Sequence, residues 1–302
     1  MIRYYRLMRY PAVFRALTGL SQAQFDVLFA DLALRLVGAV QTRRSRPNRR
    51  RAVGGGHPFA LAPRDQLLLT VVWLRRYPIY VVLGFLFGVD ETTALRTVAL
   101  VLPLLEAAGL DTMRLPDPGK GHRPSLDGLL ADTPALAVLV DTFEQRVQRP
   151  RERAEADSYY SGKQKRHTLK SQVAVNELGQ VVDVPESVRG PTADITVLKA
   201  SKLLERLPEG VGALGDLAYV GIGELHPTGL GATPRRKPRG KPRPVEDIAY
   251  NTAFARRRVK IEHTIGQLRS YQALSQTDRH HRRQHTTRVR AVAGLVNRRL
   301  AA

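Results

Sequence analysis

The stretch HTLKSQVAVNELGQVVDVPESV, residues 167–188, carries the strongest fold signal in the chain. Apolar and polar residues alternate on both sides of the turn residues Asn176 to Gly179. Alternation around a short polar turn is typical of a β-hairpin. The earlier run ALAVLVD, residues 135–141, is continuously apolar, which indicates a buried strand. Together the two stretches predict a β-sheet in the second half of the chain.

Helices and strands then follow each other beyond the hairpin. We expect a helix over residues 192–207, a strand over 211–214 and a long helix over 245–271. A basic, proline-rich loop at 234–244 precedes the last helix. The order of strand, hairpin, helix, strand, loop and helix favours an α/β fold, an RNase H-like mixed sheet with two strands antiparallel to the rest.

The first half of the chain has helical patterns instead. Residues 17–40 place apolar side chains at helical spacing, and Ser21 is a candidate N-cap. The basic linker 41–58 follows, with six arginines between Arg43 and Arg51 and then three glycines. We expect a mobile basic arm here, because such a segment cannot pack.

A second helical region, residues 63–109, is punctuated by two turns. A helix ends near Tyr77, a short helix ends at Gly88, and a third helix begins at Asp90. This pattern predicts a helix-turn-helix, although any small helical bundle produces similar spacing. The apolar face expected on the third helix consists of Leu95, Val98, Ala99 and Leu102.

A Gly/Pro-rich break at residues 116–124 suggests a boundary between two domains. We expect an all-α N-terminal domain with the helix-turn-helix over residues 1–115. An RNase H-like catalytic domain is expected over residues 130–302.

The charge of the chain limits the classes of partner. Lys and Arg number 48 against 27 Asp and Glu, which gives a formal net charge of +21. A polyanion, most commonly nucleic acid, is therefore the expected partner. A hydrophobic content of 43% is enough to bury a core, so disorder is not the whole answer.

The absence of cysteine excludes disulfides, thiolate catalysis and thiolate zinc fingers. The longest apolar region, residues 67–89, is interrupted by Arg75, Arg76 and Pro78. The remaining pieces are too short for a bilayer, which needs ~20 apolar residues. We therefore expect a soluble cytoplasmic protein, associated with the bacterial nucleoid and not with a membrane.

Three acids lie where catalysis is chemically plausible. Asp141 ends the first apolar strand, Asp216 follows the strand 211–214, and Glu262 lies inside the last long helix. Functional groups gather at the carboxyl ends of strands in open α/β sheets, so the two aspartates can meet there. Clustered carboxylates repel one another and favour Mg²⁺ or Mn²⁺ between them. Two such ions ~4 Å apart suit the cleavage of a phosphodiester.

Each acid also has a simpler interpretation. An aspartate at a strand end is often a turn residue or a helix cap. Glu262 follows Arg258 by four residues, so the two could form an ordinary ion pair on a solvated helix face. Ile265 shares that helical stripe, which indicates partial burial.

Three segments resemble one known family. They are YYSGKQKRHTLKSQVAVNELGQV (159–181), LLERLPEGVGALGDLAYVGI (203–222) and NTAFARRRVKIEHTIGQLRSYQAL (251–274). In this order they resemble the signature, second-aspartate and glutamate regions of bacterial insertion-sequence transposases of the DDE superfamily, in the branch related to Harbinger-type elements. The resemblance extends to AGLVNRRL (293–300) and covers most of the chain.

The resemblance implies a metal-dependent active site. By position, Asp141 and Asp216 match the two family aspartates and Glu262 matches the glutamate. The resemblance implies two metal ions, Mg²⁺ or Mn²⁺, as cofactors. The family pattern Arg-x3-Glu-x6-Lys is present as Arg258, Glu262 and Arg269, in which a planar guanidinium replaces the lysine ammonium.

The chain departs from the family pattern at three other places. Ala255 stands where the family has a tyrosine, three residues before Arg258. Thr142-Phe143 replaces Gly-Thr after the first aspartate, and Ala193 replaces the histidine before Asp194. We expect Asp194 to act as a helix cap.

Basic residues near the hairpin are candidate phosphate contacts, or else a solvated loop. Strand alternation would place His167 and Lys170 on opposite faces. The candidate DNA-binding residues are Lys163, Lys165, Arg166, His167, Lys170, Arg258 and Arg269. The run DRHHRRQHTTRVR (278–290) is expected to be a further phosphate contact or a basic tail.

The function implied by the resemblance is DNA transposition. Such an enzyme binds the terminal inverted repeats of its element, hydrolyses a phosphodiester at each end and joins the ends to target DNA, in a homodimer or a larger synaptic complex. Two alternatives remain open: a transposase-derived DNA-binding protein without catalytic activity, and an RNase H-like nuclease.

Overall fold

The computed structural model describes residues 1–45, 60–119 and 126–301, and it divides into two compact units. Residues 46–58 of the predicted basic arm lie outside this described part. The units differ from the predicted domain ranges at the C-terminus, and the domain assignment itself stays a prediction. The first unit comprises Met1–Thr112, Arg269–Gln276 and Arg290–Ala302, and the second comprises Met113–Leu268 and Thr277–Val289.

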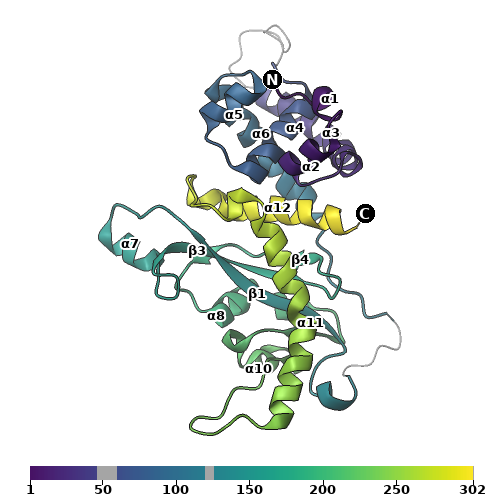
Figure 1. Ribbon diagram of the computed structural model, residues 1–302, viewed down its shortest axis with the longest axis vertical. Coiled ribbons are helices and arrows are strands. Elements are labelled where there is room, and N and C mark those ends of the chain that lie inside the picture. Colours follow the sequence, from purple (N-terminus) through teal and green to yellow (C-terminus); the bar gives the residue numbers. More distant parts are fainter. Residues whose placement is uncertain (46–59, 120–125, 302) are drawn as a thin grey trace. The chain divides into compact units, whose positions relative to one another are not determined.

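The first unit is helical (Figure 1). Its longest helix starts as predicted, because Ser21 and Gln24 form a reciprocal capping box at its N-terminus. The helices are α1 (Tyr4–Leu7), α2 (Pro11–Thr18), α3 (Gln22–Arg44), α4 (Pro63–Arg76), α5 (Tyr80–Phe87), α6 (Glu91–Leu110), η3 (Gln272–Leu274) and the last part of α12 (His285–Leu300).

Helices α4, α5 and α6 have the boundaries that the turn residues predict. Tyr77 adopts a left-handed conformation at the end of α4, and Gly88 does so at the end of α5. The Asp90 side chain accepts a hydrogen bond from the Thr93 amide and caps α6. The predicted apolar face of α6 is partly wrong, because Leu95 is 45% exposed and the neighbouring Ala94 is buried instead.

Helix α6 also passes a length and composition test for a membrane-spanning helix. In this structure it packs against α3, α4 and α5. Its apolar character therefore has an explanation as the central helix of a small bundle.

The second unit is built on a curled mixed sheet whose strands follow the order β2-β3-β1-β6-β7, with β4 and β5 also paired to β3. Strand β1 runs antiparallel to β3 and parallel to β6, which is the mixed arrangement that the sequence predicts. The strands are β1 (Leu136–Arg146), β2 (Tyr160–Ser161), β3 (Arg166–Val175), β4 (Val181–Asp183), β5 (Val188–Arg189), β6 (Val211–Leu214) and β7 (Gly231–Ala232).

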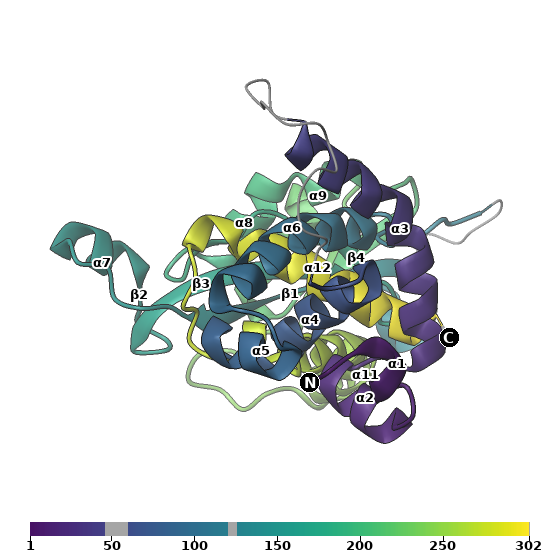
Figure 2. The ribbon, with the colours of Figure 1, turned by 90° about the horizontal axis from the view of Figure 1, so that it is seen from above.

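Helices cover both faces of this sheet, as the two views agree (Figures 1 and 2). Val138 and Val140 of β1 share an apolar core with residues of α8, α9 and α10. The alternate residue Asp141 points to the opposite face and meets α11. The helices are η1 (Gly128–Leu130), α7 (Arg153–Tyr159), α8 (Asp194–Ser201), α9 (Leu203–Arg206), η2 (Leu217–Tyr219), α10 (Ile222–Leu225), α11 (Val245–Arg269), η4 (Arg282–Gln284) and the first part of α12.

Two predicted boundaries in this unit are wrong. Strand β1 does not end at Asp141 but continues to Arg146, because β3 pairs with it over this length. The helix predicted over 192–207 is divided into α8 and α9, because Lys202 adopts a left-handed conformation with φ of 52°.

In the first unit, α6 and α12 approach each other at two glycines. A Cβ atom on Gly109 would lie 2.5 Å from the Arg290 carbonyl oxygen. A Cβ atom on Gly294 would lie 2.3 Å from the Gly109 Cα atom. The two backbones are therefore in direct contact, and only glycine fits at this crossing.

We predict that Gly294→Ala destabilises the first unit by about 1–3 kcal/mol, because the added methyl group must push two helices apart. The matched control is Gly38→Ala in α3, where an added Cβ meets no atom within 4 Å. That control should stabilise the unit by about 0.5–1 kcal/mol. Calorimetric unfolding measures both, and equal stabilisation by the two variants would contradict the close contact.

Candidate active site

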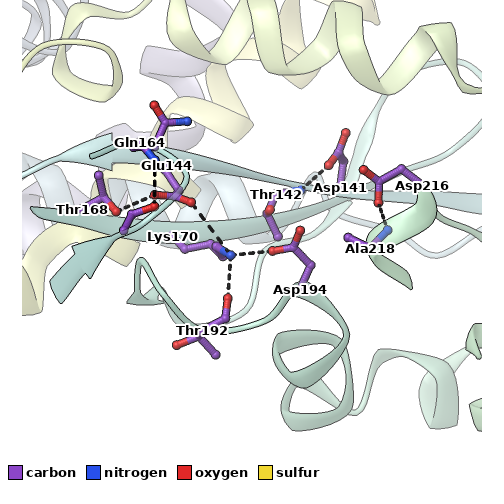
Figure 3. A network of polar contacts seen from close by, with 11 residues as sticks. Asp141, Thr142, Glu144, Gln164, Thr168, Lys170, Thr192, Asp194, Asp216 and Ala218 are labelled. Carbon is purple, nitrogen blue, oxygen red and sulfur yellow. Dashed lines mark hydrogen bonds and ion pairs between the residues drawn. The ribbon is translucent and has the colours of Figure 1, made fainter. Parts of the chain in front are cut away.

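Strand register brings the first two acids together. In the parallel pair of β1 and β6, Leu139 lies opposite Leu214. Asp141 and Asp216 each follow two residues later, so both reach the same edge of the sheet. Figure 3 shows their carboxyl groups next to each other. The sequence predicted this meeting for two strand ends, and the structure produces it where the parallel pairing ends.

Each aspartate also makes a local backbone contact. The Asp141 carboxylate accepts a hydrogen bond from the Thr142 amide at 2.7 Å. The Asp216 carboxylate accepts one from the Ala218 amide at 2.9 Å and caps η2. The simpler interpretation of Asp216 as a cap is therefore confirmed for one oxygen, while the other oxygen keeps its lone pairs for a ligand.

Arg258 links Glu262 to Asp141, because it forms an ion pair with each of them. The Arg258 guanidinium on α11 lies 3.2 Å from Asp141 and 3.8 Å from Glu262, measured from one nitrogen, Nη2, to the nearest carboxylate oxygen of each. The Arg258 side chain is 10% exposed, whereas that of Glu262 is 58% exposed. The pair is thus more than an ordinary solvated i,i+4 contact, because its cation is buried against Asp141.

The three acids influence one another electrostatically. Burial raises the pKa of Asp141 to about 6. The Thr142 amide and the Arg258 guanidinium lower this pKa, while the negative charges of Asp216 and Glu262 raise it. A nearby cation stabilises the ionised form of a carboxylate whose pKa is raised in this way, and this stabilisation favours metal binding.

The carboxylate oxygens of the three acids are suitable ligands for a hard divalent ion, but in this structure the three side chains do not converge on one point. Among the described residues, no group of three acidic or histidine side chains is close enough to hold a metal ion. Arg258 occupies the position of a cation between Asp141 and Glu262. Its displacement would free both carboxylates for a metal.

A second polar network lies beside the aspartates (Figure 3). The Lys170 ammonium donates to the Asp194 carboxylate at 2.6 Å and to the Thr192 carbonyl at 2.5 Å. Glu144 lies 4.0 Å from the same ammonium and accepts a hydrogen bond from Thr168 at 2.6 Å. Buried charges of opposite sign are thus paired around one lysine.

This network corrects the expected role of Asp194 and gives Lys170 partners inside the fold. Asp194 is the first residue of α8 and makes no side-chain cap. Its carboxylate accepts a hydrogen bond from Lys170 instead. Lys170 is 7% exposed and already hydrogen-bonded, so we leave it out of the DNA contacts proposed below. The alternation of β3 indicates that Lys170 and His167 face opposite sides, but nothing in the sequence indicates the partners of Lys170.

Tyr219 is a buried residue that the sequence reasoning missed. Its side chain has no exposed surface, and its hydroxyl group has no hydrogen-bond partner among the described residues. Burial raises its pKa, and so do the charges of Asp194, Asp141 and Asp216. The Tyr219 hydroxyl group therefore lies close enough to these three aspartates to interact with their charges. A Cβ atom on Gly215 would lie 2.5 Å from the Tyr219 Cβ, which leaves no room there for a larger residue.

The remaining candidate DNA contacts occupy different environments. Lys163, Lys165 and Arg166 are exposed around the turn between β2 and β3. His167 is half-buried and packs edge-on against Tyr160, with ring centroids 5.6 Å apart. Arg269 is exposed at the last residue of α11. Their contact with DNA stays a prediction.

The basic run 278–290 is partly structural instead of a free tail. Arg288 is fully buried and pairs with Asp278. The buried His285 contacts Gln145 at 2.9 Å and Ser187 at 2.8 Å, and burial lowers its pKa to about 3. These residues fasten the start of α12 to β1.

The strand order, the paired aspartates and the glutamate on the covering helix define a protein of the RNase H-like class. More particularly, the chain belongs to the DDE superfamily endonucleases. The family described as DDE superfamily endonuclease matches residues 140–297, which include all three acids. The helix-turn-helix of DDE superfamily endonuclease matches residues 59–110, which include α4, α5 and α6.

A similar protein is the probable transposase for insertion sequence element IS702 of Microchaete diplosiphon. It is 26% identical over 291 residues, which cover 95% of this chain and 94% of that protein. No solved structure matches the chain significantly.

We predict a pH signature for Asp141. Its folded pKa of about 6 exceeds the ordinary value of 3.8, so its contribution to stability is present below pH 4 and lost as the pH rises through 6. Asp141→Asn removes this loss. In EDTA, the unfolding free energy of the variant should therefore rise relative to the parent between pH 4 and pH 7, by at most about 3 kcal/mol. A pH-independent difference in urea unfolding would contradict the raised pKa.

A second prediction concerns Arg258. Arg258→Gln should destabilise the metal-free protein, because Asp141 and Glu262 lose their shared cation. The same change should increase the stabilisation that Mn²⁺ produces, since the ion no longer competes with the guanidinium. Thermal unfolding with and without Mn²⁺ separates the two effects. The matched control is Arg257→Gln, one residue earlier, whose guanidinium contacts Glu177 and the Pro134 and Ala135 carbonyls but none of the three candidate acids.

Proposed function

We propose that the chain is a DNA transposase that acts on the ends of its own insertion element. The observation that carries the proposal is the convergence of Asp141 and Asp216 two residues beyond the Leu139–Leu214 pair, with Glu262 on the helix that covers this edge. Membership of the DDE superfamily endonucleases, a net charge of +21 and a homologue named as a probable transposase support it.

The proposed DNA partners are the terminal inverted repeats and the target duplex. Helices α4 to α6 would bind the repeats, with α6 as the recognition helix in the major groove. Glu91, Thr92 and Arg96 in its first turns are exposed and available for this contact. Lys163, Lys165 and Arg166 would contact phosphates at the end of the sheet beyond Arg146 of β1, which adds a salt-dependent term to affinity. Two ends must meet, so the active form is proposed to be a homodimer or a larger assembly.

Catalysis is proposed to use the three acids as ligands of Mg²⁺ or Mn²⁺. When bound, one or two such ions would polarise the phosphodiester and lower the pKa of a water molecule. Asp141 and Asp216 offer oxygens from the sheet edge, and Glu262 offers one from α11. Arg258, released from the acids, can turn its planar guanidinium to the charged phosphate.

The proposed reaction has two balanced steps. Water adds to phosphorus and the bond from phosphorus to the 3′-oxygen breaks, which leaves a 3′-hydroxyl and a 5′-phosphate. That 3′-hydroxyl then attacks a target phosphodiester and displaces the target 3′-oxygen. Each attack forms one bond to phosphorus and breaks one, so no energy-carrying cofactor is needed.

The decisive variant is Asp216→Asn, assayed on a duplex that carries the inverted repeats flanking the gene. Strand cleavage should fall by about 10²–10⁴-fold, because a metal ligand worth several kcal/mol is lost. Binding to the same duplex should persist. Asp132→Asn, which changes an exposed carboxylate of the same unit, should leave both properties unchanged.

The alternatives give different outcomes in this assay. A parent protein that binds the repeats but never cleaves them, with Mn²⁺ present, is a transposase-derived DNA-binding protein. The Arg258 contact with two of the acids is the observation that favours this alternative. Cleavage without joining of a pre-cut end to a target duplex indicates a nuclease.

A further inference from the structure

The second unit contains a pocket that the proposed catalytic steps do not use. Its volume is about 440 Å³. Residues from four separate segments form it, namely the end of α7, strands β3 and β5 with the following turn, and the segment before α12. The lining residues used in the argument below are Tyr159, Leu169, Arg189, Thr192, Arg282 and Arg283.

The pocket is strongly cationic. The guanidinium of Arg189 lies 5.3 Å from the centroid of the Tyr159 ring, and that of Arg282 lies 4.7 Å from it. Arg282 also pairs with Glu155 at 2.5 Å. Arg189 and Arg283 are exposed, and within the described part of the chain neither has a carboxylate at ion-pair distance. Two guanidinium groups thus lie over one aromatic ring, and of the three arginines only Arg282 pairs with a carboxylate.

This arrangement suits an anion with several oxygens. Guanidinium groups bind phosphate through paired N–H donors, and stacking on an aromatic ring holds them in position before the ligand arrives. Because the tyrosine ring orients two of the arginines, less side-chain entropy is lost on binding than with free arginines.

The pocket opens on the same sheet face as the active site. Leu169 pairs with Gln145 of β1 and with Arg189 of β5. Side chains of directly paired residues share a face, and residues two or four apart on one strand do so as well. Asp141 and Gln145 are four residues apart on β1. The pocket therefore lies roughly 13 Å from Asp141 along the strand direction, so a DNA strand that crosses this face reaches it a few nucleotides from the scissile bond.

We infer that this arginine–tyrosine pocket holds a backbone phosphate of the DNA strand that is cut, a few nucleotides from the scissile bond. The inference rests on the proposed function, because the DNA strand is placed by the active site. The pocket fixes the path of the strand across the sheet face, and Tyr159 holds the guanidinium groups in place for it.

The test compares two double variants in an Asp216→Asn background, which prevents cleavage. Arg189→Ala/Arg283→Ala removes the two unpaired cations of the pocket. Arg151→Ala/Arg153→Ala removes the same charge from exposed arginines of the same unit outside the pocket. Fluorescence anisotropy with an element-end duplex over a range of salt should show about 10-fold weaker binding for the pocket variant and a salt slope lower by about 1–2. Circular dichroism confirms that each variant is folded.

Neutral methylphosphonate linkages then locate the contact. When each linkage near the cleavage site is replaced in turn, one substitution a few nucleotides from that site should weaken binding of the parent protein and leave the pocket variant unaffected. The inference is overturned if the pocket variant binds no more weakly than the control, or if no single linkage shows this dependence. Failure of the parent protein to bind any element end would instead contradict the proposed function. Binding without cleavage by the catalytically intact chain would contradict its catalytic part alone.

Discussion

The parallel pairing of β1 with β6 is the constraint on which the active site depends. Leu139 and Leu214 are partners in this pair, and the chain carries an aspartate two residues after each of them. A shift of one residue in register would move one carboxylate to the other face of the sheet. The apolar residues Val138, Val140, Val211 and Ala213 hold this register because they are buried under the helices of one face. The core of the second unit therefore positions its chemistry directly.

The negative charge at this edge is partly compensated within the chain. A buried carboxylate with a raised pKa, two further acids and one shared guanidinium form a set that is stable without an ion. The arginine lowers the cost of gathering negative charge, and it also opposes the gathering that a divalent ion requires. One residue thus stabilises the resting fold and sets how strongly a metal must bind to reorganise it.

Much of both units could be predicted from sequence because the signals are local. The alternation around Asn176 gives the hairpin, and the apolar run before Asp141 gives the central strand. The turn residues Tyr77, Gly88 and Asp90 give the helix-turn-helix boundaries. Family membership, which the comparisons confirm, agrees with the resemblance of the three quoted segments.

The parts that sequence could not give depend on distant partners. The continuation of β1 past Asp141 follows from pairing with β3, which strand-end rules do not contain. The partners of Lys170 come from β1 and from the turn before α8, at separations that no local pattern encodes. Arg189, Arg282 and Tyr159 are far apart in the chain, so their shared pocket is visible only in the fold.

The contact between Gly109 and Gly294 has a consequence for biosynthesis. The first unit includes Arg290–Ala302, whereas residues 113–289 are synthesised between its two main parts. Domains generally fold in the order in which they leave the ribosome, N-terminal first. The surface of α6 at Gly109 therefore cannot pack against α12 until translation has passed residue 294. The helix-turn-helix thus completes its packing only after the residues of the sheet have been synthesised.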